Sequence, residues 1–124
     1  MPAASVHPGW RRRLPLQLDE LVAAWRDPAS WDGMTEVGGI ALPGAMAGGF
    51  ALNELVLHGW DLASATGLAF DCDPAVAEAS LNFTAKVVEQ GFGDAYGPPV
   101  KVPDDAPTID RLLALTGRDP SWTP

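Results

Sequence analysis

The segment between Pro43 and Gly67 constrains the fold of this chain more than any other feature. Pro43 suits the first position of a helix, and Gly67 suits a glycine cap at its end. Hydrophobic residues point in nearly every direction around that helix: Met46, Phe50, Leu52, Leu55, Val56, Leu57, Trp60, Leu62 and Ala63. A helix that is apolar most of the way round is buried against several neighbours. We therefore predict a core helix over residues 43–67.

The chain contains 13 Gly and 12 Pro among 124 residues, and these residues separate it into helical segments and loops. Leu14, Leu18, Val22 and Trp25 form one apolar stripe, which predicts a helix. The predicted helices are residues 15–26, 73–91 and 107–117, and the segments between them are an extended loop or short hairpin at 34–42 and a long loop at 92–106. The expected fold class is all-α, a helical bundle with long Gly/Pro-rich loops, in a single domain of residues 1–124.

Composition excludes several classes of protein. Eight Lys and Arg against sixteen Asp and Glu give a net charge of -8, which disfavours binding to nucleic acid. Cys72 is the only cysteine, so an intrachain disulfide and an all-thiolate zinc site are excluded. No apolar run is long enough to span a membrane, and none follows the arginines at 11–13, so we expect no secretory signal. We expect a cytoplasmic protein with no nucleic-acid or membrane partner.

Glu54, His58 and Asp61 carry the chemistry of the core helix. At about 100° per residue they fall within roughly 60° of one another, on one face. Inside an apolar helix such groups must be paired, hydrogen-bonded or metal-bound. Glu54 and His58 can offer an oxygen and a nitrogen to one divalent ion, with Asp61 orienting a ligand. The alternative is that Glu54 and His58 form a simple ion pair at i, i+4.

The sequence around these residues resembles the actinobacterial mycothiol-dependent maleylpyruvate isomerase-like group, within the DinB-like metal-binding four-helix bundles. The resemblance covers nearly the whole chain. It is carried by ALNELVLHGWDLASATG at 51–67, WRRRLP at 10–15, WRDP at 25–28, YGPP at 96–99, VPDDAP at 102–107 and DRLLALTGRDP at 110–120.

The resemblance implies a DinB-like bundle and a metal site. Members of the group hold a divalent ion with a His from an early helix and a Glu and a His four residues apart on a later one; Glu54 and His58 match the later pair. The chain resembles the C-terminal portion of the family and lacks its N-terminal helices, including the one with the first His. The third ligand is then His7, Asp61, water or a residue of another chain. We expect a homodimer, in which each copy supplies helices that the other lacks.

Two functions of different classes follow. The first is a divalent-metal-binding protein, holding zinc or alternatively nickel or iron, that acts as a thiol-dependent isomerase or transferase with mycothiol as the small-molecule thiol. The second is a non-catalytic helical module that dimerises or binds a partner and carries a degenerate metal site. The sequence leaves the catalytic residues, the substrate and the reaction open.

Overall fold

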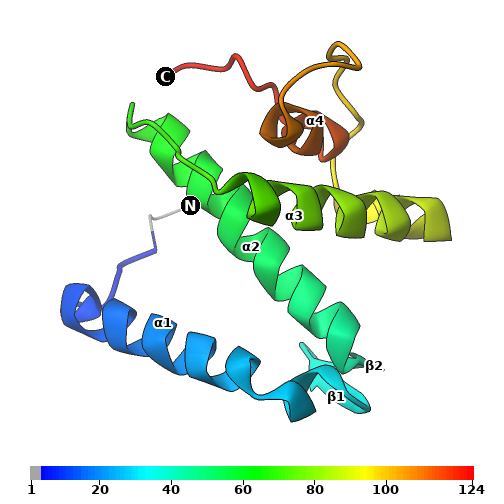
Figure 1. Cartoon of the computed structure of the whole chain (residues 1–124). Helices are drawn as coiled ribbons and strands as arrows, with labels where there is room; N and C mark the ends of the chain where they lie inside the picture. The colour runs from blue at the N-terminus through cyan, green and yellow to red at the C-terminus, as the bar shows by residue number, and fades with distance from the viewer. Residues whose placement is uncertain (1–3) are drawn as a thin grey trace. The chain divides into compact units, whose positions relative to one another are not determined.

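Figure 1 shows a computed structural model of the chain, which describes residues 4–124. Among these residues the structure is mostly helical, with four α-helices and one two-stranded sheet. The chain divides into two compact units, residues 1–48 and 49–124. The boundary falls inside α2 (Gly44–Ala65), at the glycine pair Gly48-Gly49. The mostly helical class and the hairpin are as predicted.

Helix α1 (Trp10–Arg26) begins five residues before the predicted start at Pro15. Its first turn is formed by the amides of Arg12 and Arg13, which donate to the carbonyl of Gly9 at 3.1 Å. Pro15 therefore lies inside the helix, where it lacks an N–H to donate. Proline is a weaker marker of a helix start here than the stripe that surrounds it. None of the described residues of α1 is buried.

The end of α1 is held by a short 3-10 turn, η1 (Pro28–Trp31). The indole Nε1 of Trp31 donates to the carbonyl of Trp25 at 2.9 Å, and the two rings meet edge to face with centroids 5.0 Å apart. The ring of Trp31 also covers Gly48, where any side chain would collide with it. Trp31 therefore links α1 to the first turn of α2.

Residues 34–43 form a β-hairpin, which confirms the second of the two predicted alternatives. Strand β1 (Met34–Val37) pairs antiparallel with β2 (Ile40–Pro43), and Val37 is opposite Ile40. The two turn residues, Gly38 and Gly39, have φ of 57° and 81°. Positive φ at both positions is the requirement of a tight type I′ turn, which glycine meets without strain.

The second unit is built on the remainder of α2. Val56 and Leu57 of this helix form the core with Leu112 and Leu113 of α4 (Thr108–Leu115). The helix ends at Gly67, with φ of 70°, and the amide of Leu68 returns to the carbonyl of Ala63 at 2.8 Å, so the predicted glycine cap is confirmed.

The prediction that α2 is buried on most sides is confirmed in part, since most of its residues are buried or half-buried. Leu55 and Leu62 lie seven positions apart on one face, and their exposed fractions are 49% and 68%. The hydrophobic pattern was correct for helix formation and for most of the helix surface, but the face that carries Leu55 and Leu62 is open to solvent.

Helix α3 (Pro74–Val87) begins as predicted. The side chain of Asp73 caps it by accepting from the amide of Ala75 at 2.8 Å. It continues into a π-helical turn, η2 (Val88–Phe92), and a 3-10 turn, η3 (Gly93–Ala95). Gly91, the predicted end, has φ of 90° within that turn. Phe83 of α3 packs edge to face on Phe50 of α2, with centroids 5.0 Å apart.

Helix α4 closes on Gly117, which confirms the predicted end of the last helix. Within residues 4–124, none of the helices is both long and apolar enough to cross a membrane.

Candidate functional site

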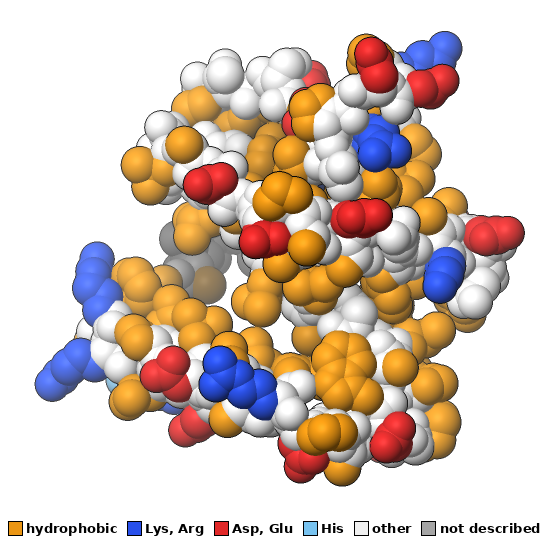
Figure 2. Space-filling model, viewed as in Figure 1, with side chains coloured by type: hydrophobic (Ala, Val, Ile, Leu, Met, Phe, Trp, Pro, Cys, Tyr) orange, Lys and Arg blue, Asp and Glu red, His pale blue; other side chains and the backbone are white. Residues whose placement is uncertain are grey.

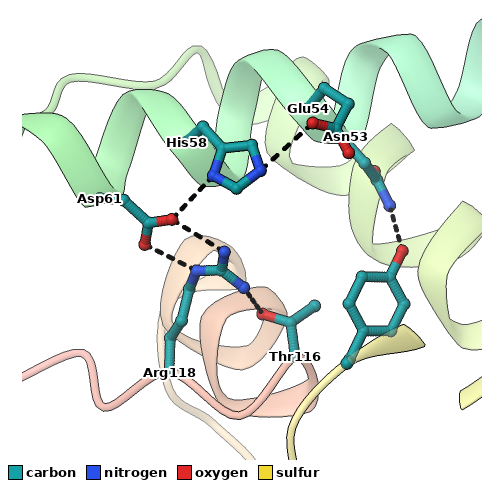
Figure 3. Close-up of polar contacts among 7 residues, drawn as sticks. Asn53, Glu54, His58, Asp61, Thr116 and Arg118 are labelled. Atoms are coloured by element: carbon teal, nitrogen blue, oxygen red, sulfur yellow. Dashed lines mark hydrogen bonds and ion pairs between the residues drawn. The ribbon is translucent and has the colours of Figure 1, made fainter. Parts of the chain in front are cut away.

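Glu54, His58 and Asp61 lie side by side on one face of α2, as the sequence predicts (Figure 3). The Nε2 atom of His58 is 3.2 Å from Oε2 of Glu54. Its other ring nitrogen, Nδ1, is 3.0 Å from Oδ2 of Asp61. The imidazole thus lies between two carboxylates, one at each of its ring nitrogens.

This face is largely open to solvent, contrary to the expectation of a buried site. The exposed fractions of the side chains are 71% for Glu54, 62% for His58 and 38% for Asp61. Burial therefore does not force these groups to pair, because water can solvate them. Their mutual orientation has to be explained by their contacts instead.

Asp61 is fixed by Arg118, a residue that sequence reasoning assigned no role. Nε of Arg118 donates to Oδ1 of Asp61 at 2.8 Å, and Nη2 donates to Oδ2 at 2.9 Å. A two-point pair of this kind restrains both partners in one plane. The Arg118 guanidinium holds the pKa of the Asp61 carboxyl below its usual value, and hydrogen bonding to His58 lowers it further against the opposing effect of burial. Asp61 is accordingly an anion near neutral pH.

The backbone conformation at the end of α4 directs the side chain of Arg118 toward Asp61. Gly117 adopts φ of 83°, and the amide of Arg118 returns to the carbonyl of Leu113 at 2.9 Å. The Nη1 atom of Arg118 also donates to the hydroxyl of Thr116 at 3.1 Å. A glycine cap thus turns the chain so that the next side chain reaches α2. Arg118 lies 57 positions from Asp61, so no local spacing could have connected the two residues.

The ionised Asp61 determines which nitrogen of His58 carries a proton. A carboxylate can only accept, so Nδ1 of His58 has to be the donor in that contact. In the neutral ring Nε2 is then an acceptor, and it faces the Glu54 carboxylate, a second acceptor, at 3.2 Å. Two acceptors at this distance repel each other. A proton shared between them would form the simple ion pair that the sequence leaves as an alternative, and a divalent ion bound by both would form the predicted metal site.

The described residues supply two donors for a metal ion at this point. Within residues 4–124, no group of three or more His, Cys, Asp or Glu side chains is arranged to hold one. Asp61 contacts the opposite nitrogen of His58 and is already paired with Arg118, so its position is that of an orienting residue. His7 belongs to the first unit, where its Nδ1 accepts from the amide of Gly9 at 3.0 Å.

A second polar cluster is buried beside this face, and the sequence analysis did not predict it. The side-chain nitrogen Nδ2 of Asn53 donates to the hydroxyls of Thr84 and Tyr96, at 2.8 Å and 3.2 Å. Its side-chain oxygen Oδ1 accepts from the hydroxyl of Ser80. Asn53, Ser80 and Thr84 are 2%, 0% and 0% exposed. Ser80 and Thr84 lie on the same stripe of α3 as the buried Ala77 and Val87, and small polar residues within an apolar stripe are the signal that could have revealed the cluster.

Cys72 and the arginine run at residues 11–13 are not among the contacts of this site. Burial raises the pKa of the Cys72 thiol, and the neighbouring carboxylates of Asp73 and Asp71 raise it further, so the reactive thiolate is disfavoured. The Arg11, Arg12 and Arg13 side chains are exposed, and the guanidinium of Arg11 lies over the Trp10 ring, 4.6 Å from its centroid.

Comparison with known proteins finds distant relatives only. No protein-family model and no solved structure matches the chain. Two proteins of Mycobacterium tuberculosis, from strains CDC 1551 and H37Rv, are each 32% identical to it over 80 residues, and both are named as uncharacterised. The alignment takes in 62% of this chain and 44% of each relative, so the chain spans less than half the length of the curated relatives it matches. Their source agrees with the expected actinobacterial character of the sequence.

Proposed function

We propose that this chain is a divalent-metal-binding helical protein of the DinB-like, maleylpyruvate isomerase-like kind, with Glu54 and His58 as ligands. The observation that carries the proposal is the pair of acceptor atoms, Nε2 and Oε2, which face each other at 3.2 Å on an exposed helix face. Donor atoms bound to one zinc ion at about 2.0–2.1 Å are separated by a similar distance. Asp61, itself held by Arg118, fixes the ring so that Nε2 presents its lone pair.

The remaining ligand positions are filled from outside this pair, by water or by a side chain of a second copy. Imidazole plus carboxylate suits zinc first, and nickel or iron as alternatives. A bound ion would act as a Lewis acid that lowers the pKa of a thiol or water. We propose mycothiol as that thiol and an isomerase or transferase reaction; this step rests on the sequence resemblance alone.

Zinc titration by calorimetry tests the metal site. We expect the wild-type protein to bind Zn²⁺, the His58→Ala variant to lose measurable binding, and the Asp61→Asn variant to bind about tenfold more weakly, since Asp61 only orients the ring. The affinity should fall with decreasing pH, because protons compete for the same lone pairs. Glu78→Gln, which removes an exposed acid from α3, is the control and should bind as wild type does. Unchanged zinc binding in His58→Ala would refute the assignment.

A second candidate function is a non-catalytic module that binds another copy of the chain. It is favoured by α1, which has no buried residue although Leu14, Leu18 and Val22 form an apolar stripe with exposed fractions of 43%, 39% and 47%. Hydrophobic side chains are visible at the surface over this helix in Figure 2. We propose a homodimer in which the stripe is covered.

Light scattering on matched variants tests this candidate. Leu18→Glu places a charge within the stripe and should convert a dimer into a monomer. Leu16→Glu places the same charge on the opposite side of α1, at an even more exposed position, and should leave the mass unchanged. A wild-type protein that is monomeric at all concentrations contradicts the dimer. Chelation separates the two functions, because removal of a bound ion lowers the melting temperature only if the ion stabilises the fold.

A further inference from the structure

A hollow of about 300 Å³ lies in the second unit, next to the Asp61–Arg118 pair. One wall comes from the last turns of α2 and the other from the segment after α4, which is drawn in red in Figure 1. Its lining includes Trp60, Asp61 and Ser64 from α2 and Arg118, Asp119 and Trp122 from the C-terminal segment. Neither the proposed metal pair nor the buried Asn53 cluster occupies this hollow.

The segment that carries Trp122 is held in a defined turn. The carboxylate of Asp119 accepts from the amide of Ser121 at 2.9 Å and from its hydroxyl at 2.6 Å. The amide of Trp122 then donates to the carbonyl of Asp119 at 3.1 Å. These contacts restrain the backbone that carries Trp122 beside the hollow before any ligand arrives, which reduces the entropy lost on binding.

The electrostatics of the hollow favour a cation. The guanidinium of Arg118 is already bound to both oxygens of Asp61, whereas the Asp119 carboxylate is held only by the uncharged Ser121. The three charged groups therefore leave one uncompensated negative charge. Residues 49–124 as a whole carry eleven acidic and four basic side chains, which repel anions further.

The two indoles favour the same kind of ligand. The face of a tryptophan ring carries negative charge density and attracts an organic cation, best of all when the cation brings an apolar body that the ring can cover. The volume is at the lower limit for ligand pockets, so the ligand is small. We propose that this hollow binds a small organic ammonium ion, contacted by Trp60 and Trp122 and neutralised by Asp119. The proposed metal ligands Glu54 and His58 do not line this hollow, although Asp61, which contacts His58, does.

The proposal is tested by NMR with choline as the probe, on the full chain labelled with nitrogen-15. The five tryptophans provide five indole N–H signals, which single Trp substitutions assign. Choline should shift the signals of Trp60 and Trp122 with saturation, and those of the first unit, from Trp10, Trp25 and Trp31, should not move. Dimethylbutanol, in which carbon replaces the charged nitrogen of choline, should bind at least about fivefold more weakly.

Matched variants identify the contacts. Trp122→Leu should weaken choline binding about tenfold, and Asp119→Asn should weaken it about threefold and reduce its sensitivity to salt. Trp10→Leu and Asp104→Asn make the same changes at exposed positions outside the hollow and should bind choline as wild type does. The unshifted signals of the remaining residues show whether a variant is folded.

Three results would overturn the proposal. Equal affinity for choline and dimethylbutanol would mean an apolar hollow without charge selectivity. Tighter binding of the anion dimethylbutanoate would mean that Arg118, not Asp119, dominates. The absence of a saturable shift of Trp60 and Trp122 at choline concentrations of about 10 mM would mean no site of even millimolar affinity.

Discussion

Asp61 contacts His58 on one side and Arg118 on the other, so a single carboxylate connects α2 to the segment after α4. Asp61→Asn keeps the shape of the side chain and removes its charge. We expect it to lower the free energy of unfolding by about 1 kcal/mol at neutral pH, a modest value because the Asp61 side chain is 38% exposed. Chemical denaturation measures this loss, and Asp104→Asn in an exposed loop is the control, with a change near zero.

The same variant has a predicted pH dependence. The pKa of Asp61 is lowered from its ordinary value of 3.8, chiefly by the hydrogen bonds from Arg118. A carboxyl group whose pKa is lower in the folded state stabilises the fold above its unfolded pKa, and this stabilisation is lost as the pH falls through the folded value. The stability difference between wild type and Asp61→Asn should therefore shrink below pH 3.8. A difference that stays constant with pH would show that charge is not its origin.

Asn53 is the buried residue with the largest expected effect. Asn53→Ala leaves the Ser80 hydroxyl without its acceptor in a fully buried position, and we expect a loss of about 3 kcal/mol in unfolding free energy. Tyr96→Phe removes one longer hydrogen bond of the same cluster and should cost about 1 kcal/mol. Asn82→Ala, at an exposed position of α3, should change stability by less than about 0.5 kcal/mol. Equal losses in Asn53→Ala and Asn82→Ala would contradict the role given to the buried cluster.

At the scale of elements, the ends of helices were the features that sequence predicted best. Gly67 and Gly117 both end helices with positive φ, because glycine is the residue that adopts this conformation without steric cost. The start of α1 was wrong because Pro15 does not prevent a helix from extending toward the N-terminus for one further turn. The burial of α2 was predicted only in part, because an all-round hydrophobic pattern does not reveal that the face with Leu55 and Leu62 stays exposed.

The two capping glycines provide a matched test of helix ends. Alanine at Gly67 adopts a left-handed φ of 70° but meets no atom within 4 Å, so Gly67→Ala should cost about 1 kcal/mol. Alanine at Gly117 has φ of 83° and also places its Cβ 2.8 Å from the carbonyl carbon of Gly97. Gly117→Ala should therefore cost at least about 2 kcal/mol more, and thermal unfolding measures both losses. Similar melting temperatures for the two variants would rule out the Gly97 contact as a source of the difference.

At the scale of the whole chain, the two units differ in how much they bury. Helix α3 buries Ala77, Ser80, Thr84 and Val87, whereas α1 buries none of its residues. Backbone amides exchange with solvent through local opening, which is easier where few apolar contacts must break. In the monomeric Leu18→Glu variant, we expect the amides of α1 to exchange at least about a hundredfold faster than those of α3 in hydrogen-exchange mass spectrometry. Equal protection of α1 and α3 in that monomer would contradict this difference in burial, whereas stronger protection of α1 in the wild type is expected from the homodimer.

Only the part of the site that lies on a single helix could be predicted from the sequence. Glu54, His58 and Asp61 share a face because helical geometry places positions i, i+4 and i+7 together, and this needs no tertiary information. Arg118 and the partners of Asn53 come from other elements, and their positions depend on how α3 and α4 pack. Neighbours that are distant in sequence are determined by packing, which periodicity does not encode.

Asn53 and Glu54 are consecutive residues with opposite environments, one inside the fold and the other in solvent. Consecutive side chains of a helix differ in direction by about 100°, so the bonds that Asn53 makes to α3 also set the angle of rotation of α2 about its own axis. That angle decides which way Glu54 and His58 point. A substitution at Ser80 or Thr84 could therefore rotate the helix and redirect its outer face while every helical hydrogen bond stays intact. The buried hydrogen bonds of Asn53 thus determine the direction in which the proposed metal ligands Glu54 and His58 point at the surface.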